Sequence, residues 1–308
     1  MTKNLFTTPV LFCIFNRLDT AKQVFSLIQK IKPEHLYIAS DGPRKNQVKD
    51  EMIKVQAVRD YVLNNIDWPC KVKTLFREEN LGCNTAITGA ITWFFQQEEQ
   101  GIILEDDCLP TLSFFTYCEE LLDKYKDDKN IYHIAGYTPI EDEKIFTESD
   151  YGFACVANVW GWATWRRAWQ CYSAEITNRA VLHQKLTKIF SRRLPRMYFE
   201  YIMRKNYITW DYLWTFSVIR NDAICITPYK NMVLNIGMNG SATHDAGIDD
   251  TNKNSYELTF PLRHPKWNGM EWNADLNNEL AAGAKHILRR TISKSLSKTW
   301  KLLSRELK

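Results

Sequence analysis

Three consecutive carboxylates, Glu105, Asp106 and Asp107, directly follow the apolar run 101–104 in the segment GIILEDDCLP. Adjacent carboxylates repel one another in a folded protein, and a bound divalent cation removes that cost. Oxygen ligands favour Mg²⁺ or Mn²⁺, which bind through one or two carboxylates together with substrate phosphates. A solvated acidic turn before a helix is the alternative, and for an isolated acidic triplet it is about equally common. The position after a buried strand favours the metal site, with Asp107 as a ligand.

Two other polar clusters also follow apolar runs. Asn16 and Arg17 come after the run 9–15, and Asp41 follows the run 36–40 within ASDGPR. Arginine pairs with phosphate or stacks on a base, and an aspartate can accept hydrogen bonds from a base or a ribose. Each cluster alone is more often a simple turn. Three of them at neighbouring strand ends predict a ligand pocket.

The segment ENLGCNTAITGAI places Asn80 and Gly82 just before a predicted helix. A glycine there lets the backbone approach a ligand, although helix capping explains the same residues equally well. The sequence contains neither GxGxxG nor GxxxxGK[ST]. A dinucleotide-binding or NTPase phosphate loop is therefore not indicated.

Eleven tryptophans are many for 308 residues, and six of them lie in NVWGWATWRRAW and ITWDYLW. Core packing is the more frequent role of any one tryptophan. Tryptophans beside glycine and aspartate can also form a flat wall on which a sugar stacks. Asp211, between two aromatic residues, would lie in a low-polarity setting that suits a general base. The candidate substrate-binding residues are Trp160, Trp162, Trp210 and Tyr212.

A glycine-rich segment, NIGMNGSATHD, covers residues 235–245. Its two glycines would allow the loop to close over a ligand, and His244 could then supply a further metal ligand or a phosphate contact.

Short apolar runs alternate with helix-period segments through the first third of the chain. The pattern predicts strands at 9–15, 36–40, 71–76 and 101–104, with helices at 19–31, 47–64 and 84–97, the first of them capped by Asp19. This alternation predicts parallel βαβ units, in which ligands bind beyond the carboxyl ends of the strands. The later sequence is less regular. It predicts a helix at 112–125, strands at 131–136, 151–159, 223–227 and 232–237, and helices up to about residue 221.

The order of these motifs resembles that of the N-acetylglucosaminyltransferase I-like enzymes and their bacterial polysaccharide-biosynthesis relatives. Strand-Asn-Arg, strand-Ser-Asp, strand-Glu-Asp-Asp, Gly-Trp, Trp-Asp and a glycine-rich Ser-x-x-His loop follow one another across about residues 8–245. The resemblance implies a GT-A fold, an α/β architecture with a mixed sheet flanked by helices. It would divide 1–283 into a nucleotide-sugar-binding half, 1–110, and an acceptor-binding half, 111–283.

The same resemblance implies roles for the polar clusters. Arg17 and Asp41 would contact the nucleotide, and Glu105 and Asp106 would contact the ribose and the donor sugar. Asp107 would hold the metal. Asp211 would be the catalytic base of an inverting transfer from a UDP-sugar to a glycan hydroxyl. The chain departs from the secreted enzymes because its eight cysteines lack metal-ligand or paired spacing and no secretory anchor is evident, which favours a bacterial surface glycan as acceptor.

The segment 284–308 carries eight Lys or Arg and one acid, a net charge of +7 in a chain of +4. Its apolar residues recur every three or four positions, which predicts an amphipathic helix attracted to anionic lipid. A helix packed on the body is the alternative. The remaining 283 residues carry −3, which argues against nucleic-acid binding. No window reaches the roughly 20 apolar residues of a membrane span, so we expect a cytoplasmic protein that associates peripherally with the inner face of the plasma membrane.

The sequence therefore predicts a metal-dependent, inverting glycosyltransferase that uses a UDP-sugar donor, Mn²⁺ or Mg²⁺, and a glycan acceptor that could be carried on a lipid. A retaining glycosyltransferase on the same fold would need no base at Asp211. A glycan-binding protein without catalysis would use the tryptophans as a platform for sugars. A nucleotidyltransferase is disfavoured because a basic, glycine-rich triphosphate loop is absent from the N-terminal region.

Overall fold

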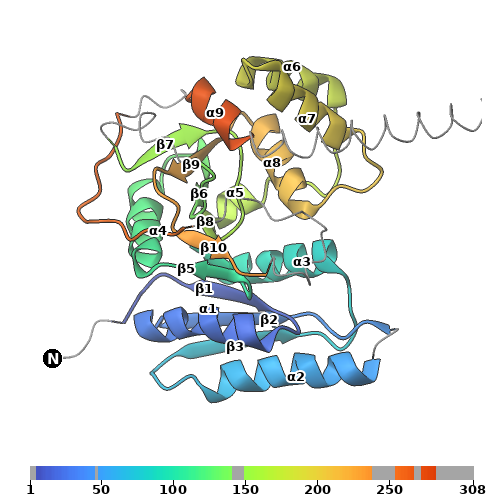
Figure 1. Ribbon diagram of the computed structural model, residues 1–308, viewed down its shortest axis with the longest axis vertical. Helices are drawn as coiled ribbons and strands as arrows, with labels where there is room; N and C mark the ends of the chain where they lie inside the picture. Colours follow the sequence, from blue (N-terminus) through green and yellow to red (C-terminus); the bar gives the residue numbers. More distant parts are fainter. Residues whose placement is uncertain (1–4, 46–47, 141–148, 238–253, 267–271, 282–308) are drawn as a thin grey trace, which may run out of the picture.

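The computed structural model describes residues 5–45, 48–140, 149–237, 254–266 and 272–281. A mixed sheet of eight strands forms its centre, in the order β3-β2-β1-β4-β8-β6-β9-β7 (Figure 1). The strands are β1 (Val10–Ile14), β2 (His35–Ser40), β3 (Lys71–Phe76), β4 (Gln100–Glu105), β6 (Ile131–Ala135), β7 (Tyr151–Ala154), β8 (Trp162–Trp165) and β9 (Ile224–Pro228). The expected mixed α/β fold is confirmed.

The first four strands of this order are parallel, and β1 lies between β2 and β4. They are connected by α1 (Leu18–Ile31), α2 (Val48–Asn64) and α3 (Cys83–Phe95). The chain first adds strands on one side of β1 and then crosses to the other side to form β4. In open α/β sheets, such a reversal of strand order leaves a crevice at the carboxyl ends of the strands.

The second part of the chain extends the same sheet. Strand β8 pairs antiparallel with β4 and with β6, and β9 pairs parallel with β6. A separate two-stranded ribbon joins β5 (Cys108–Pro110) to β10 (Val233–Asn235). One continuous sheet therefore contains strands from both sides of residue 110. The expected division of the chain into two functional halves at this residue stays a prediction.

The two faces of the sheet are buried by different helices. In β1, Val10 and Phe12 pack into one core, and Leu11 and Cys13 into the other, as the alternation of side chains along a strand requires. Helices α1, α2 and α4 (Leu112–Lys124) cover the first face, and α3, α5 (Arg166–Trp169) and α8 (Trp210–Arg220) cover the second. Both cores are fully apolar at β1, which explains why the strand reads as one continuous apolar run.

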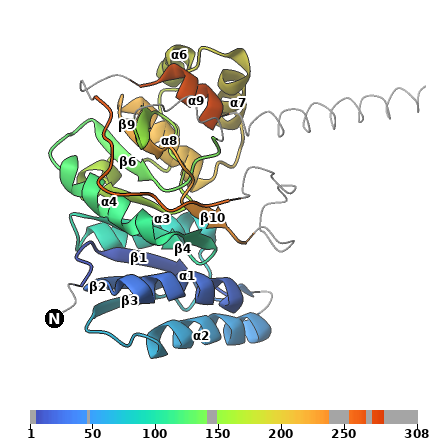
Figure 2. The ribbon, with the colours of Figure 1, turned by 60° about the vertical axis from the view of Figure 1, so that its left-hand side comes forward.

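Helices α6 (Arg179–Ile189), α7 (Arg193–Met203) and α9 (Ala274–Leu280) gather at one end of the molecule. Helix α2 lies at the opposite end, and both views of the ribbon agree on this arrangement (Figures 1 and 2). No helix among the described residues is long and apolar enough to cross a membrane. All eight cysteines are free thiols.

Three details differ from the expectation. Arg17, and not Asp19, occupies the N-cap position of α1, so Asp19 lies in the first turn. Glu105 is the last residue of β4, paired with Cys13 of β1, and is not part of a loop. Strand β7 ends at Ala154, because the amide of the next residue donates to the Oδ1 of Asn277 at 2.7 Å instead of continuing the ladder.

Candidate functional site

A cavity of about 740 Å³ lies at the carboxyl ends of β1, β2 and β4. Its floor comes from the strand ends and α3, and its opposite wall comes from α7, α8 and the segment between them. The expected polar clusters share this one space. The expected site residues that line it are Arg17, Asp41, Asn80, Gly82, Glu105, Asp106, Asp107, Trp160, Trp210, Asp211 and Tyr212.

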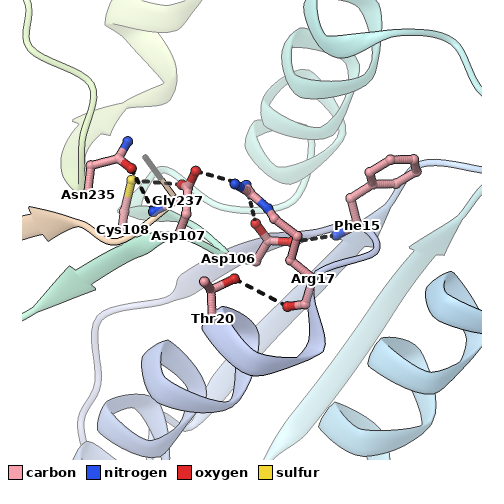
Figure 3. A network of polar contacts seen from close by, with 8 residues as sticks. All are labelled: Phe15, Arg17, Thr20, Asp106, Asp107, Cys108, Asn235 and Gly237. Atoms are coloured by element: carbon pink, nitrogen blue, oxygen red, sulfur yellow. Dashed lines mark hydrogen bonds and ion pairs between the residues drawn. The ribbon is translucent and has the colours of Figure 1, made fainter. Parts of the chain in front are cut away.

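Two residues of the acidic triplet, Asp106 and Asp107, are held by Arg17, and Asp106 is also held by the backbone (Figure 3). One guanidinium nitrogen of Arg17, Nη2, donates to Oδ1 of Asp106 and to Oδ2 of Asp107, both at 2.8 Å. The amide of Phe15 donates to the other oxygen of Asp106 at 2.9 Å. Although burial lowers the pKa of Arg17, the two carboxylates raise it above its usual value.

The ion pairs of Arg17 reduce the need for a bound cation at the acidic triplet. Repulsion within the triplet was expected to demand a bound cation, but Arg17 already compensates two of the three carboxylates. Burial raises the pKa of Asp106 to about 6, against the opposing effect of Arg17. One positive charge thus offsets part of the charge of two carboxylates, and Arg17 is engaged with acids at the place where it was expected to contact a nucleotide.

Among the described residues, no basic side chain forms an ion pair with Glu105, although the charge of Arg17 acts on it. Burial raises its pKa to about 8, and the charges of Asp107 and Asp106 raise it further than Arg17 lowers it. Asp211, across the cavity, is close enough to raise this pKa as well. The Glu105 side chain is enclosed by protein but borders the cavity, so it keeps some contact with solvent. Much of the Glu105 population is therefore protonated at neutral pH.

The chemistry of the cluster fits a hard divalent cation at Asp107. Its Oδ2 accepts from Arg17, and its Oδ1 accepts a weak hydrogen bond from the Cys108 thiol at 3.5 Å. The described residues contain no group of three or more His, Cys, Asp or Glu side chains placed to hold a metal ion. Mg²⁺ and Mn²⁺ are often bound by one or two carboxylates, with substrate phosphates and water completing the shell. The expected second ligand, His244, lies outside the described residues.

Asp41 fixes the loop that precedes α3. Its Oδ1 and Oδ2 accept the amide of Leu81 at 3.1 Å, and Oδ2 also accepts the amide of Gly82 at 3.2 Å. Gly82 has φ 78° and ψ 157°, a conformation almost restricted to glycine. The Asn80 amide donates to the carbonyl of Gly42 at 2.8 Å, which ties the same loop to the end of β2. Asp41, Asn80 and Gly82 together shape one edge of the cavity.

Asn16 does not line the cavity. Its amide nitrogen donates to Oε1 of Glu51 at 2.8 Å. Glu51, on α2, is 3% exposed, and its other oxygen accepts the backbone amide of Arg44 at 2.6 Å. The pair joins the ends of β1 and β2, so Asn16 positions the strand ends and the Arg44 side chain, which borders the cavity.

Asp211 stands in the first turn of α8, on the wall opposite the acidic triplet. Asn84 of α3 sets the start of this helix. Its Nδ2 donates to the carbonyl of Ile208 at 2.9 Å, and its Oδ1 accepts the amide of Trp210 at 3.0 Å. The two hydrogen bonds connect the floor of the cavity to the residue immediately before Asp211.

The expected aromatic wall is only partly present. Trp160, Trp210 and Tyr212 border the cavity, and the hydroxyl of Tyr212 makes a short hydrogen bond with that of Tyr198 on α7. Trp162 does not border it. It is 1% exposed, stacks on His133 with ring centroids 4.9 Å apart, and packs in the core of β8. The expectation that Trp162 contacts substrate is wrong, because a β8 side chain on this face is covered by α5 and α8.

The β10 ribbon closes the site next to Asp107. The amide of Ile236 donates to the Asp107 carbonyl at 2.8 Å. A Cβ on Gly237 would lie 2.4 Å from both the Arg17 Nη1 and the Asp107 Oδ2, so a side chain there would displace the ion pair. The glycine is required by the close approach of this backbone to the acidic cluster.

Several site residues gave no sequence signal. Glu51 lies within a charged helix segment, and Asn84 reads as an ordinary residue at a helix start. Tyr198 and Lys205 of the α7 region also line the cavity. Their role depends on helices far from the strand ends in sequence, so no local pattern could have identified them.

No family profile matches the chain, and no curated protein matches it in sequence. Solved structures that resemble it include a UDP-glucose pyrophosphorylase complexed with UDP-glucose, at 11% identity, TM-score 0.40, 75% of this chain and 94% of that one. Others are the galactosyltransferase LgtC in complex with donor and acceptor sugar analogs (12%, TM-score 0.31, 54% and 60%) and HddC from Yersinia pseudotuberculosis (12%, TM-score 0.31, 52% and 78%). A TM-score below 0.5 does not establish a shared fold, so function is inferred from the site itself.

Proposed function

We propose that this chain is a metal-dependent glycosyltransferase of the GT-A type, which transfers a sugar from a UDP-sugar to a hydroxyl of a glycan acceptor with inversion. The observation that carries the proposal is the single cavity at the strand-order reversal. Its floor holds an acidic cluster with Arg17, and its facing wall holds Asp211. A two-sided cavity of about 740 Å³ has room for a nucleotide-sugar and part of an acceptor.

The donor would lie along the strand ends. Asp41 and the loop that it holds at Leu81 and Gly82 would contact the nucleoside. Arg17, which pairs with Asp106 and Asp107, would act on the phosphates through its charge. Asp107 would hold Mn²⁺ or Mg²⁺, which supplies Lewis-acid stabilisation of charge on the leaving diphosphate. Arg17 carries the same sign of charge as the metal, so it would add to the stabilisation of the diphosphate.

The acceptor would lie against α7 and α8. Asp211 would take the proton of the attacking hydroxyl as its oxygen bonds to the anomeric carbon. The bond from that carbon to the diphosphate oxygen breaks, and the nucleoside diphosphate leaves with its electron pair. Attack from the side opposite the diphosphate inverts the anomeric centre. The two hydrogen bonds of Asn84 to the segment before Asp211 would keep this base in place.

Two alternatives from the sequence receive less support. A glycan-binding platform built from tryptophans would need exposed indole faces, but Trp162, Trp210 and Trp214 are each less than 5% exposed. A retaining enzyme would not need a carboxylate facing the donor from the far wall, where Asp211 stands. The involvement of a lipid-linked bacterial polysaccharide as acceptor belongs to the same proposal.

The test is a panel of UDP-sugars incubated with Mn²⁺, Mg²⁺ or chelator, with hydrolysis and transfer both measured. Asp211→Asn should retain donor affinity and lose about 10²–10⁴-fold in turnover, the range for loss of a general base. Asp222→Asn is the matched control, because Asp222 is exposed and does not line the cavity. Asp107→Ala should fold normally and lose metal-dependent donor binding. Wild-type turnover in the Asp211 variant, or full activity with chelator, would contradict the base or the metal respectively.

A further inference from the structure

The outer face of α7 is apolar and exposed. Leu194, Met197 and Tyr201 are 50%, 38% and 38% exposed, and their spacing of three and four residues places them on one side of the helix. Tyr207, just beyond the helix, is 64% exposed. Four of the eleven large exposed apolar side chains among the described residues thus lie within one short stretch. A concentration of this kind marks an interaction surface more often than scattered single residues do.

The same region is strongly basic. Between residues 179 and 207 the sequence carries eight Lys or Arg and one acid, Glu200, a net charge of +7. Some of this charge is neutralised locally, for example by the ion pair of Arg192 with Glu279. Among the described residues, no acid forms an ion pair with Arg193, Arg204 or Lys205, which flank the apolar stripe. The stripe therefore has a basic rim.

Helix α7 also forms a wall of the cavity. Its opposite side carries Tyr198 and Ile202, which line the cavity, and Lys205 follows at the rim. One helix thus separates the cavity from the exposed stripe. Anything that binds the outer face lies next to the wall against which the acceptor would rest.

The segment 284–308, which lies outside the described residues, follows α9 in the sequence. Helix α9 ends beside the start of α7, where Asn278 donates to the Ser191 hydroxyl at 2.7 Å. The segment 284–308 also carries +7, however, so it would add to the positive charge there. The segments 179–207 and 284–308 each carry a net charge of +7, so the rest of the chain carries −10 within a total of +4. A second copy of the chain would present the same +7 across the interface.

We infer that the face of α7 formed by Leu194, Met197 and Tyr201, with Arg193, Arg204 and Lys205 at its rim, binds an anionic lipid bilayer. An apolar stripe with a basic rim matches the interfacial zone of such a bilayer, since the apolar side chains enter the acyl boundary while the cations pair with lipid phosphates. Bilayer contact through α7 places the cavity wall at the membrane surface. Delivery of a lipid-linked acceptor from there rests on the proposed function, whereas the membrane contact itself does not.

The test is sedimentation of the full chain with phosphatidylcholine vesicles, with and without phosphatidylglycerol, at low and high salt. Wild-type protein should bind the anionic vesicles only, and salt should weaken the binding. Arg193→Ser/Arg204→Ser should lower the partition coefficient roughly 30-fold, at roughly fivefold for each basic residue near the surface. Leu194→Ser/Met197→Ser/Tyr201→Ser should lower it at least about tenfold at both salt concentrations.

Met52→Ser/Ile53→Ser is the matched control, because these α2 side chains are 52% and 68% exposed at the opposite end of the molecule (Figure 1). It should bind vesicles as the wild type does, and thermal melting should show that every variant is folded. Unchanged vesicle binding in both α7 variants would overturn the inference and assign the membrane contact to the segment 284–308. A wild-type dimer that the apolar triple variant dissociates, with vesicle binding unchanged, would overturn it as well. UDP-sugar turnover tests the proposed function, and vesicle binding tests the membrane contact. The Asp211 variant should lose turnover and keep vesicle binding, so failure of one proposal can be told from failure of the other.

Discussion

The protonation of Glu105 should make the stability of the free protein fall as pH rises. Burial, and then the neighbouring Asp107 and Asp106, raise the pKa of Glu105 from 4.5 to about 8. Between these two values the folded protein holds a proton that the unfolded chain has released. Raising the pH through this interval therefore favours unfolding, and above pH 8 the whole cost is present. Asp106 contributes with the same sign, but its pKa of about 6 confines its effect mainly to lower pH.

The shift sets the size of the effect. At about 1.4 kcal/mol per pKa unit, the shift from 4.5 to about 8 corresponds to at most about 5 kcal/mol. Water in the cavity and small movements of the adjacent carboxylates lower this, so we expect about 2 kcal/mol. For a chain of this length that is about 3–6 °C in Tm. Glu105→Gln keeps the shape of the side chain and removes its ionisation.

Thermal unfolding in chelator, without nucleotide, measures this effect between pH 6 and pH 9. The wild-type Tm should fall with pH, whereas the Tm of Glu105→Gln should change little and exceed that of the wild type at high pH. Asp127→Asn, at an exposed acid far from the cavity, should follow the wild type. If the Tm of Glu105→Gln falls as much as that of the wild type over this pH range, Glu105 is not the source of the pH dependence.

Three other substitutions test the positioning of the site. Gly82→Ala should destabilise the protein by about 1–3 kcal/mol in chemical denaturation, because alanine strongly disfavours φ 78° with ψ 157°. An unchanged denaturation midpoint would contradict this backbone conformation at residue 82. Asn84→Ala should lower turnover more than donor affinity, because it removes both hydrogen bonds to the segment before Asp211. Equal losses in kcat and kcat/KM with a normal Tm would support this role, and an unchanged kcat would contradict it. Gly237→Ala should weaken UDP binding measured by calorimetry, because its Cβ would meet Arg17 and Asp107 at 2.4 Å, and wild-type affinity would show that the ion pair is dispensable.

Much of the first half of the fold could be predicted from the sequence because its signals are local. The continuous apolar runs at β1, β2 and β4 are those of strands buried on both faces. Their alternation with helices requires parallel pairing, which brings their polar ends to one edge. The meeting of Arg17, Asp41 and Asp107 in one cavity follows from these features alone.

The second half was less predictable because its elements depend on distant partners. Strand β8 has four residues and is held between β4 and β6, and β5 has three residues and pairs with β10 over 120 positions later. Tryptophans that lie close together in the sequence therefore differ in their exposure to the cavity. Trp160 borders the cavity because it precedes β8 and is separated from it by Gly161, whose φ is 60°. Trp162 is buried because it is the first residue of β8 and packs against Trp169 of α5 and Trp214 of α8.

Residue types and spacing already identify the groups available for chemistry: three adjacent acids, an arginine after β1, and an aspartate among aromatic residues. The distribution of their charges depends on the fold. Arg17 pairs with both Asp106 and Asp107, while Glu105 is enclosed with a raised pKa. Asn16 turns from the cavity to Glu51, and Asn84 reaches across to the start of α8. Such pairings depend on distances between side chains far apart in sequence, and the fold sets those distances while residue type and spacing do not.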